Sequence, residues 1–228
     1  MGYNIEMKCV SPFGTMTVPD GVFWHVEEEK KMERQTVYKV NEIFETIQGE
    51  GFFTGEPVIF VRLSGCSMGC EFCDTKYSQE IHYNLTAEQI LRQLENFTKK
   101  RVVISGGEPF EQDLAQLLCA LNRENYDISI ETNGAHPIIK SYGTWVTVSP
   151  KKQFLSESLK SASEIKFVIS NEEDIVRAKK MMSHYKKDYF YLQPESGKEE
   201  ATKLCVKTCL EDPRFKLSVQ VHKLIDIK

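Results

Sequence analysis

Residues 58–75 read VIFVRLSGCSMGCEFCDT and place an apolar run directly before three closely spaced cysteines. The run Val58–Val61 is typical of a buried β-strand, so the cysteines stand on the loop that follows this strand. Cys66, Cys70 and Cys73 follow one another at spacings of four and three, which lets three thiolates converge on one inorganic centre. Thiolates favour zinc and iron–sulfur clusters over hard cations. Because a zinc site or a four-iron cluster normally takes four ligands, the loop predicts a centre with one open position.

The same cysteines admit a second interpretation, a structural zinc site. In that case a distant residue would supply the fourth ligand, and the candidates are His82, Cys9 and Cys119. Such a site would stabilise a binding module and would leave no position open for chemistry. The residues around the loop decide between the two interpretations.

The loop also carries a resemblance to a known superfamily. The pattern Cys-x-x-x-Cys-x-x-Cys, with Phe72 directly before the last cysteine, resembles the cluster loop of the radical S-adenosylmethionine enzymes. In that superfamily three cysteines bind three irons of a four-iron cluster, and S-adenosylmethionine chelates the fourth iron. The resemblance implies this role for Cys66, Cys70 and Cys73.

Composition limits the class of protein. The 228 residues suit one domain with an appendage. The 29 basic and 33 acidic residues give a net charge of −4, so the chain lacks the basic surface of a protein that binds nucleic acid directly. No stretch approaches the roughly 20 apolar residues of a membrane span, and the N-terminus lacks the apolar core of a signal peptide. We predict a cytoplasmic protein in which three of the four cysteines outside the loop, Cys119, Cys205 and Cys209, are buried thiols.

Strand-like and helix-like segments alternate from residue 38 onward. The predicted strands are 38–44, 58–64, 101–105, 128–131, 145–148, 165–170, 189–193 and 216–221. The predicted helices are 86–97, which opens with a capping box, 114–121, 171–182 and 198–210. Strands joined through helices run parallel, but a closed eight-stranded barrel takes about 250 residues. We therefore predict an α/β fold: an incomplete, open TIM-like barrel of about six parallel strands with shortened helical crossovers.

Residues 1–35 differ from the rest of the chain. They contain turn formers, two short β-like runs at 15–18 and 22–26, and a run of charged residues at 27–34. We predict an N-terminal extension, either a hairpin followed by a charged linker or a disordered segment, and assign it no chemistry. The catalytic domain would span residues 36–228.

Polar turns follow several of the predicted strands. The turn at 105–109 reads SGGEP, and those at 131–134, 149–151 and 193–196 read ETNG, SPK and QPES. The carboxyl ends of parallel strands meet at one end of the sheet, so a polyatomic ligand could lie across all four turns. In the first turn the two glycines would let the backbone approach a ligand, and Glu108 would accept a hydrogen bond from a cationic amine.

Arg62 stands four residues before Cys66 and is a candidate for anion binding. A buried arginine is costly without an anionic partner, so a substrate that carries a carboxylate is its natural counterpart. The alternative is a salt bridge on the protein surface, which we would favour if Arg62 stood alone.

Arg62 does not stand alone, because ten segments together resemble the 7-carboxy-7-deazaguanine synthase family of the queuosine and 7-deazapurine pathway. They are 44–51, 51–66, 73–77, 105–109, 131–134, 145–151, 163–170, 192–196, 201–209 and 217–223. The resemblance extends from about residue 38 to the C-terminus. Another small radical S-adenosylmethionine enzyme, such as a glycyl-radical-enzyme activase, would share the cysteines and the GGEP turn but would not need the FETIQGEG segment or Arg62.

The resemblance implies a reaction and a set of partners. The family converts 6-carboxy-5,6,7,8-tetrahydropterin to 7-carboxy-7-deazaguanine with loss of ammonia. One electron from the cluster cleaves S-adenosylmethionine, and the resulting 5′-deoxyadenosyl radical removes a substrate hydrogen that later returns, so that the cofactor is regenerated. The implied partners are the pterin, an electron donor such as flavodoxin or ferredoxin, and a second copy of the chain in a homodimer.

The resemblance also assigns roles to matching residues, none of them as a side-chain acid or base. The residues that would contact S-adenosylmethionine are Phe72, Asp74, Gly107, Glu108, Ser149, Pro150, Lys151, Gln193, Pro194, Glu195 and Ser196. Those that would contact the pterin are Ile47, Gln48, Gly49, Arg62 and Ser105, with Arg62 opposite its carboxylate. Thr75 would ligate Mg²⁺, a hard cation that prefers oxygen ligands.

Overall fold

The structure is a computed structural model of the chain, and it describes residues 6–7, 35–71, 73–75, 79–98 and 101–228. The β-like runs and the charged run predicted within 8–34 lie outside the described residues, as does Phe72. The proposed division of the chain at residue 35 therefore stays a prediction.

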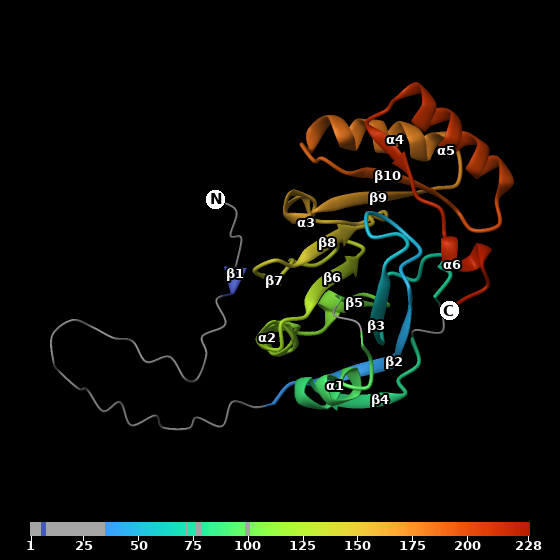
Figure 1. Cartoon of the computed structure of the whole chain (residues 1–228). Coiled ribbons are helices and arrows are strands. Elements are labelled where there is room, and N and C mark those ends of the chain that lie inside the picture. The colour runs from blue at the N-terminus through green and yellow to red at the C-terminus, as the bar shows by residue number, and fades with distance from the viewer. Residues whose placement is uncertain (1–5, 8–34, 72, 76–78, 99–100) are drawn as a thin grey trace, which may run out of the picture.

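The described residues form a curved, open sheet of nine strands (Figure 1). The strands are β2 (Val37–Ile47), β3 (Pro57–Leu63), β4 (Tyr83–Thr86), β5 (Arg101–Gly106), β6 (Asp127–Thr132), β8 (Trp145–Val148), β9 (Glu164–Ile169), β10 (Phe190–Pro194) and β11 (Phe215–Leu217). Their order is β11-β10-β9-β8-β6-β5-β3-β2-β4, and the seven strands from β11 to β3 run parallel. The edge strands β11 and β4 do not pair with each other, so the predicted open α/β barrel is confirmed, with seven parallel strands where about six were expected.

One edge of the sheet differs from the prediction. β2 pairs antiparallel with both β3 and β4, and β4 has no counterpart among the predicted strands. Residues 48–56 join β2 to β3, and this connection is too short for the crossover that parallel pairing requires. The predicted strand at 216–221 also ends early, because the chain turns into helix α6 (Val221–Leu224).

The connection between β6 and β8 contains no helix. It contributes the short strand β7 (Lys140–Ser141), which pairs in parallel with β1 (Glu6–Met7). This pair stands apart from the main sheet (Figure 1).

Helices cover the outer face of the curved sheet (Figure 1). They are α1 (Ala87–Leu94), α2 (Ala115–Arg123), α3 (Ser156–Ser161), α4 (Glu172–His184) and α5 (Glu199–Glu211). The predicted capping box opens α1: Gln89 N donates to Thr86 Oγ1, and Thr86 N donates to Gln89 Oε1. Asn171 caps α4 in a similar way. No helix in the described part of the chain has the length and hydropathy of a membrane span.

The parallel strands present two different faces. On the outer face, residues such as Val61, Ile104 and Phe167 pack against the helices in two hydrophobic clusters, one under α1 and α2 and one under α3, α4 and α5. Successive side chains of a strand point to opposite faces. The alternate positions therefore face the concave side, where the strands carry Arg62, Ser105, Glu131, Lys166 and Gln193.

The cysteines outside the predicted cluster loop have different environments. Cys205 is buried in the cluster under α5, as expected, whereas Cys209 is only partly buried against the same cluster. Cys119 on α2 is disulfide-bonded, so the prediction of a thiol at this position was wrong.

Candidate active site

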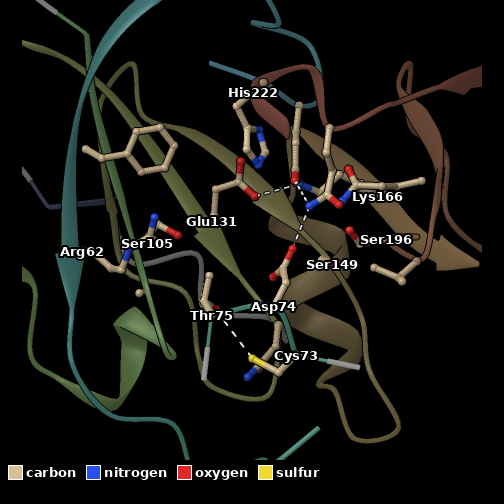
Figure 2. Close-up of a pocket in the computed structure, with 18 of the residues that line it drawn as sticks. Arg62, Cys73, Asp74, Thr75, Ser105, Glu131, Ser149, Lys166, Ser196 and His222 are labelled. Atoms are coloured by element: carbon tan, nitrogen blue, oxygen red, sulfur yellow. Dashed lines mark hydrogen bonds and ion pairs between the residues drawn. The ribbon is translucent and has the colours of Figure 1, made fainter. Parts of the chain in front are cut away.

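A cavity on the concave side of the sheet gathers residues from both halves of the chain (Figure 2). The predicted residues that line it are Ile47, Gln48, Gly49, Arg62, Cys66, Cys70, Cys73, Asp74, Thr75, Ser105, Gly107, Ser149, Lys151, Gln193, Pro194, Glu195 and Ser196. Of the described residues that were expected to contact a ligand, Glu108 and Pro150 are absent from this lining. The strand-end turns that were separate in the sequence therefore border one space.

The three cysteines of the loop after β3 all reach this cavity. The protein itself orders the loop: Cys73 N donates to Cys70 O at 3.2 Å, and Ser67 N donates to Glu111 Oε1 at 2.7 Å. No three His, Cys, Asp or Glu side chains among the described residues are close enough to hold one metal ion. A four-iron cluster does not require that convergence, because each cysteine binds a different iron. Three thiolates on one loop beside a cavity are a donor set that fits a four-iron cluster.

Thr75 lies beside the cysteines, with its Oγ1 3.6 Å from Cys73 Sγ (Figure 2). It also lines the cavity, so its hydroxyl stands where it could share a cation with a bound ligand. Its role as a magnesium ligand stays a prediction.

The two glycines after β5 allow a close approach between segments of the protein. A Cβ atom on Gly106 would lie 2.0 Å from Leu63 O, and one on Gly107 would lie 1.9 Å from Gly65 O. Gly107 N donates to Leu63 O at 3.1 Å, and Glu108 N donates to Gly65 O at 2.8 Å. The end of β5 thus lies against the backbone that leads into the cysteine loop. The sequence had suggested an approach to a ligand, whereas the approach in the structure is to this loop.

We expect Gly107→Ala to lower the iron content of the reconstituted protein. The added methyl group would collide with Gly65 O and would lie 2.8 Å from Cys66 Cβ, so the first cluster ligand would be displaced. Iron and sulfide analysis after anaerobic reconstitution measures the effect, with circular dichroism to confirm folding. Gly143→Ala is the control: a Cβ there meets no atom within 4 Å, and the strain of an alanine at its φ of +76° falls on a turn outside the cavity lining. Iron content equal to that of the wild type in Gly107→Ala would contradict this role.

Glu108 is 1% exposed, and the protein itself occupies its carboxylate. The carboxylate accepts hydrogen bonds from Thr132 Oγ1 at 2.7 Å, Asn133 N at 2.7 Å and Phe110 N at 3.1 Å. Burial raises the pKa of Glu108, and the hydrogen bond from Thr132 opposes the shift. These contacts tie the turn after β5 to the end of β6. The geometry supports a positioning role for Glu108 and gives no support to its predicted contact with a cationic amine.

Arg62 is 9% exposed and has an anionic partner within the protein. Its Nε donates to Glu42 Oε1 at 2.8 Å, and its guanidinium carbon lies 5.7 Å from the ring centres of Phe44 and Phe60. Burial alone would raise the pKa of Glu42, but hydrogen bonds from Lys228 and Arg62 hold that pKa below its ordinary value. The burial of Arg62 therefore does not by itself require an anionic substrate. Its place in the cavity wall keeps it the predicted partner of a substrate carboxylate.

Comparison with known proteins identifies the family. Residues 60–152 match the Radical SAM superfamily. The 7-carboxy-7-deazaguanine synthase of Buchnera aphidicola is 37% identical over 218 residues, which cover 84% of this chain and 99% of that protein. The synthase of the same name from Escherichia coli K12 is 36% identical over 221 residues, which cover 83% of this chain and 99% of that protein.

Comparison with a solved structure gives the same result as the sequence comparison. The crystal structure of QueE from Escherichia coli superposes with a TM-score of 0.74 at 36% identity and covers 81% of this chain and 94% of that chain. The chain belongs to the 7-carboxy-7-deazaguanine synthase family. The prediction of a radical S-adenosylmethionine enzyme is confirmed, and this family is favoured over a glycyl-radical-enzyme activase and over a zinc-stabilised module.

The cavity of this synthase family member also contains a buried charged group that the sequence analysis missed. Lys166 on β9 is 3% exposed; its Nζ donates to Glu131 Oε2 at 2.9 Å and also to Glu50 (Figure 2). Burial alone would lower the pKa of Lys166, but Glu131 and Glu50 outweigh burial and hold that pKa above its ordinary value. Burial has the opposite effect on a carboxyl group and alone would raise the pKa of Glu50, but Lys166 holds that pKa below its ordinary value. Two carboxylates and one ammonium leave this wall with a net negative charge.

A signal for this group was present in the sequence. Lys166 interrupts a run of apolar residues in a central parallel strand, and such strands are normally apolar on both faces. A lysine at that position is seldom buried unless it is paired. The identity of its partners was not readable, because Glu50 and Glu131 lie 116 and 35 positions away.

The predicted Ser149–Lys151 turn borders the same cavity. Lys151 Nζ donates to Ser149 Oγ at 2.9 Å. Burial, and then the charge of Lys166, lower the pKa of Lys151. The two residues thus present a cation and a hydroxyl together at the rim where the contact with S-adenosylmethionine is predicted.

Proposed function

We propose that this protein is a 7-carboxy-7-deazaguanine synthase that converts 6-carboxy-5,6,7,8-tetrahydropterin to 7-carboxy-7-deazaguanine with loss of ammonia, in queuosine and 7-deazapurine biosynthesis. One observation carries the proposal. The three cysteines share a cavity with Gln48, Gly49, Arg62 and the strand-end turns. The chain that forms this cavity matches 99% of the length of two synthases at 36–37% identity.

The cavity residues divide into those that would hold the cofactors and those that would hold the substrate. Cys66, Cys70 and Cys73 would hold a four-iron cluster, and the turns at 149–151 and 193–196 would hold S-adenosylmethionine. When bound, the cluster and S-adenosylmethionine supply the one-electron chemistry that starts a radical reaction. The protein binds and orients the reactants around them.

Charge complementarity would orient the pterin. Arg62 would face the substrate carboxylate from one side of the cavity. The net negative wall formed by Glu50, Lys166 and Glu131 would accept hydrogen bonds from the N–H groups of the pterin ring. Together they would orient the substrate, with its carboxylate toward Arg62 and its ring toward the charged wall.

The finer parts of the proposal rest on the family resemblance. They are magnesium at Thr75, flavodoxin or ferredoxin as the electron donor, assembly as a homodimer and a cytoplasmic location.

A turnover assay tests the proposed function. The reconstituted protein is reduced and incubated with S-adenosylmethionine and 6-carboxytetrahydropterin, and the product is identified by mass. We expect 7-carboxy-7-deazaguanine to form. Cleavage of S-adenosylmethionine without this product would indicate a different radical reaction, and a colourless protein that binds zinc instead of iron would support the structural alternative.

Arg62→Ala is expected to weaken pterin binding about tenfold or more, because a hydrogen bond to a charged group is worth about 1.5–3 kcal/mol. Iron content and cleavage of S-adenosylmethionine should stay close to those of the wild type. Isothermal titration with the pterin measures the affinity. Arg101→Ala is the matched control, since Arg101 pairs with Glu56 at 2.9 Å outside the cavity lining. Unchanged pterin affinity in Arg62→Ala would count against the contact.

A further inference from the structure

Residues 218–223, here named the clasp, touch three of the segments predicted to bind ligands. The contacts are Ser218 Oγ to Gln193 Oε1 at 3.0 Å, Val221 N to Gly49 O at 3.0 Å and Lys223 Nζ to Asp74 Oδ2 at 2.6 Å. The clasp therefore joins the turn after β10, the connection between β2 and β3, and the cysteine loop. No residue of the clasp was among the predicted site residues.

Gln220 forms the central link of the clasp. Its Nε2 donates to Glu50 Oε1 at 2.7 Å and to Asp74 Oδ2 at 2.8 Å. Its Oε1 accepts a hydrogen bond from Lys223 Nζ at 2.8 Å. A single amide nitrogen thus bridges a carboxylate of the cysteine loop and a carboxylate of the buried charged group.

The bridge lies within a continuous row of polar side chains. From the cysteine loop inward, each in contact with the next, these are Lys223, Asp74, Gln220, Glu50, Lys166 and Glu131. Glu50 cannot move without weakening the pairing of the buried Lys166, which is costly. Asp74 is more exposed, and hydrogen bonds from Gln220 and Lys223 hold its carboxylate in place. The positions of Asp74 and Glu50 therefore depend on each other through Gln220.

We propose that Gln220 is a positioning residue that couples the S-adenosylmethionine site to the pterin site. The inference rests on the proposed function, in which Asp74 contacts S-adenosylmethionine and the residues next to Glu50 contact the pterin. A ligand that fixes Asp74 also fixes Glu50, so each ligand prepares part of the other's site. Because such coupling is reciprocal, each ligand strengthens the binding of the other by the same factor.

The test measures binding to the reconstituted protein with its cluster oxidised, so that no turnover occurs. Titration calorimetry gives the affinity for S-adenosylmethionine and for 6-carboxytetrahydropterin, each alone and with the other ligand saturating. The coupling factor is the affinity for one ligand when the other ligand is saturating, divided by its affinity when the other ligand is absent. We expect a factor of about 5 to 150 in the wild type, the usual range for coupled sites. In Gln220→Ala the factor should fall close to one while the iron content is unchanged.

Two further variants sharpen the test. Gln93→Ala replaces a glutamine on α1 outside the cavity lining and should keep the wild-type coupling factor. Gln220→Glu keeps the size of the side chain but brings a third carboxylate against Asp74 and Glu50, so it should weaken S-adenosylmethionine binding more than Gln220→Ala does. Circular dichroism confirms that each variant is folded.

The outcomes separate this inference from the proposed function. An unchanged coupling factor in Gln220→Ala, or a wild-type factor of one, overturns the role of Gln220 and leaves the proposed function intact. Failure of the wild type to bind the pterin overturns the proposed function instead. In that case the coupling of the two sites falls with the proposed function, and S-adenosylmethionine binding decides only whether Gln220 positions Asp74: weaker binding to Gln220→Ala supports that role, and equal binding overturns it.

Discussion

Cys70→Ala is expected to abolish formation of 7-carboxy-7-deazaguanine, because two cysteines cannot hold the cluster that three would share. The loss should appear at once in iron content, in the visible absorption of the reconstituted protein and in product measured by mass. Circular dichroism should remain that of the wild type, since Cys70 is half-exposed on a loop and belongs to neither hydrophobic cluster.

Cys209→Ala is the matched control for this experiment. Cys209 packs against a hydrophobic cluster on α5 and does not line the cavity. We expect this variant to keep its iron and its activity. Full turnover by Cys70→Ala with no iron bound would end the proposal of a cluster at this loop.

Lys166→Met is expected to lower the free energy of unfolding by about 3–5 kcal/mol, the usual cost of removing one partner from a buried ion pair. The change would leave Glu50 and Glu131 without their shared cation, with Glu164 close to Glu131 on the same wall. Urea denaturation near pH 7 measures the loss.

The contribution of this buried charged group to the pH dependence of stability should change sign in this variant. In the wild type the pKa of Glu50 lies below its ordinary value of 4.5, so its contribution is complete above that pH and is lost as the pH falls. The pKa of Lys166 lies above its ordinary value of 10.5, so its contribution is lost only as the solution becomes strongly alkaline. Without the lysine, the folded protein would bind protons more readily than the unfolded chain, because the carboxylates repel each other. Stability of Lys166→Met should therefore rise as the pH falls from about 7 to about 5.5.

Two further variants complete this experiment. Lys203→Met removes a lysine that also pairs with two glutamates, Glu199 and Glu200, but on the exposed surface of α5, and it should leave the urea midpoint unchanged. If Lys166→Met does not fold, the double variant Lys166→Met/Glu131→Gln should recover part of the stability, since it removes one of the two negative charges that repel each other. If Lys166→Met is stable and keeps the pH dependence of the wild type, the buried charged group contributes little to the free energy of unfolding.

Short-range patterns predicted the local parts of this molecule well. The capping box at Thr86 closes within three residues, and its hydrogen bonds are present as predicted. The spacing of Cys66, Cys70 and Cys73 places all three on one loop, and that loop reaches the cavity. Such features depend on residues a few positions apart, so the sequence contains all the information that they require.

Features that join distant segments were predicted less well. The antiparallel pairing of β2 depends on the length of the connection at 48–56, and the strand expected at 216–221 is cut short where the clasp begins. The carboxylate of Glu108 turned out to bind Thr132 and Asn133, which follow it on the next strand. Each of these outcomes is decided by which segments the folded sheet brings side by side.

By itself, the sequence determined the cysteine loop and the open α/β architecture, because thiolate spacing, capping and strand–helix alternation act over short stretches of chain, and its resemblance to known sequences indicated the family. Only the tertiary structure decided that Arg62 pairs with Glu42, that Lys166 lies between Glu50 and Glu131, and that Gln220 reaches Asp74 across 146 positions. The physical reason is that a buried charge takes its partners from whichever strands become neighbours in the sheet, and strand order is a property of the whole fold.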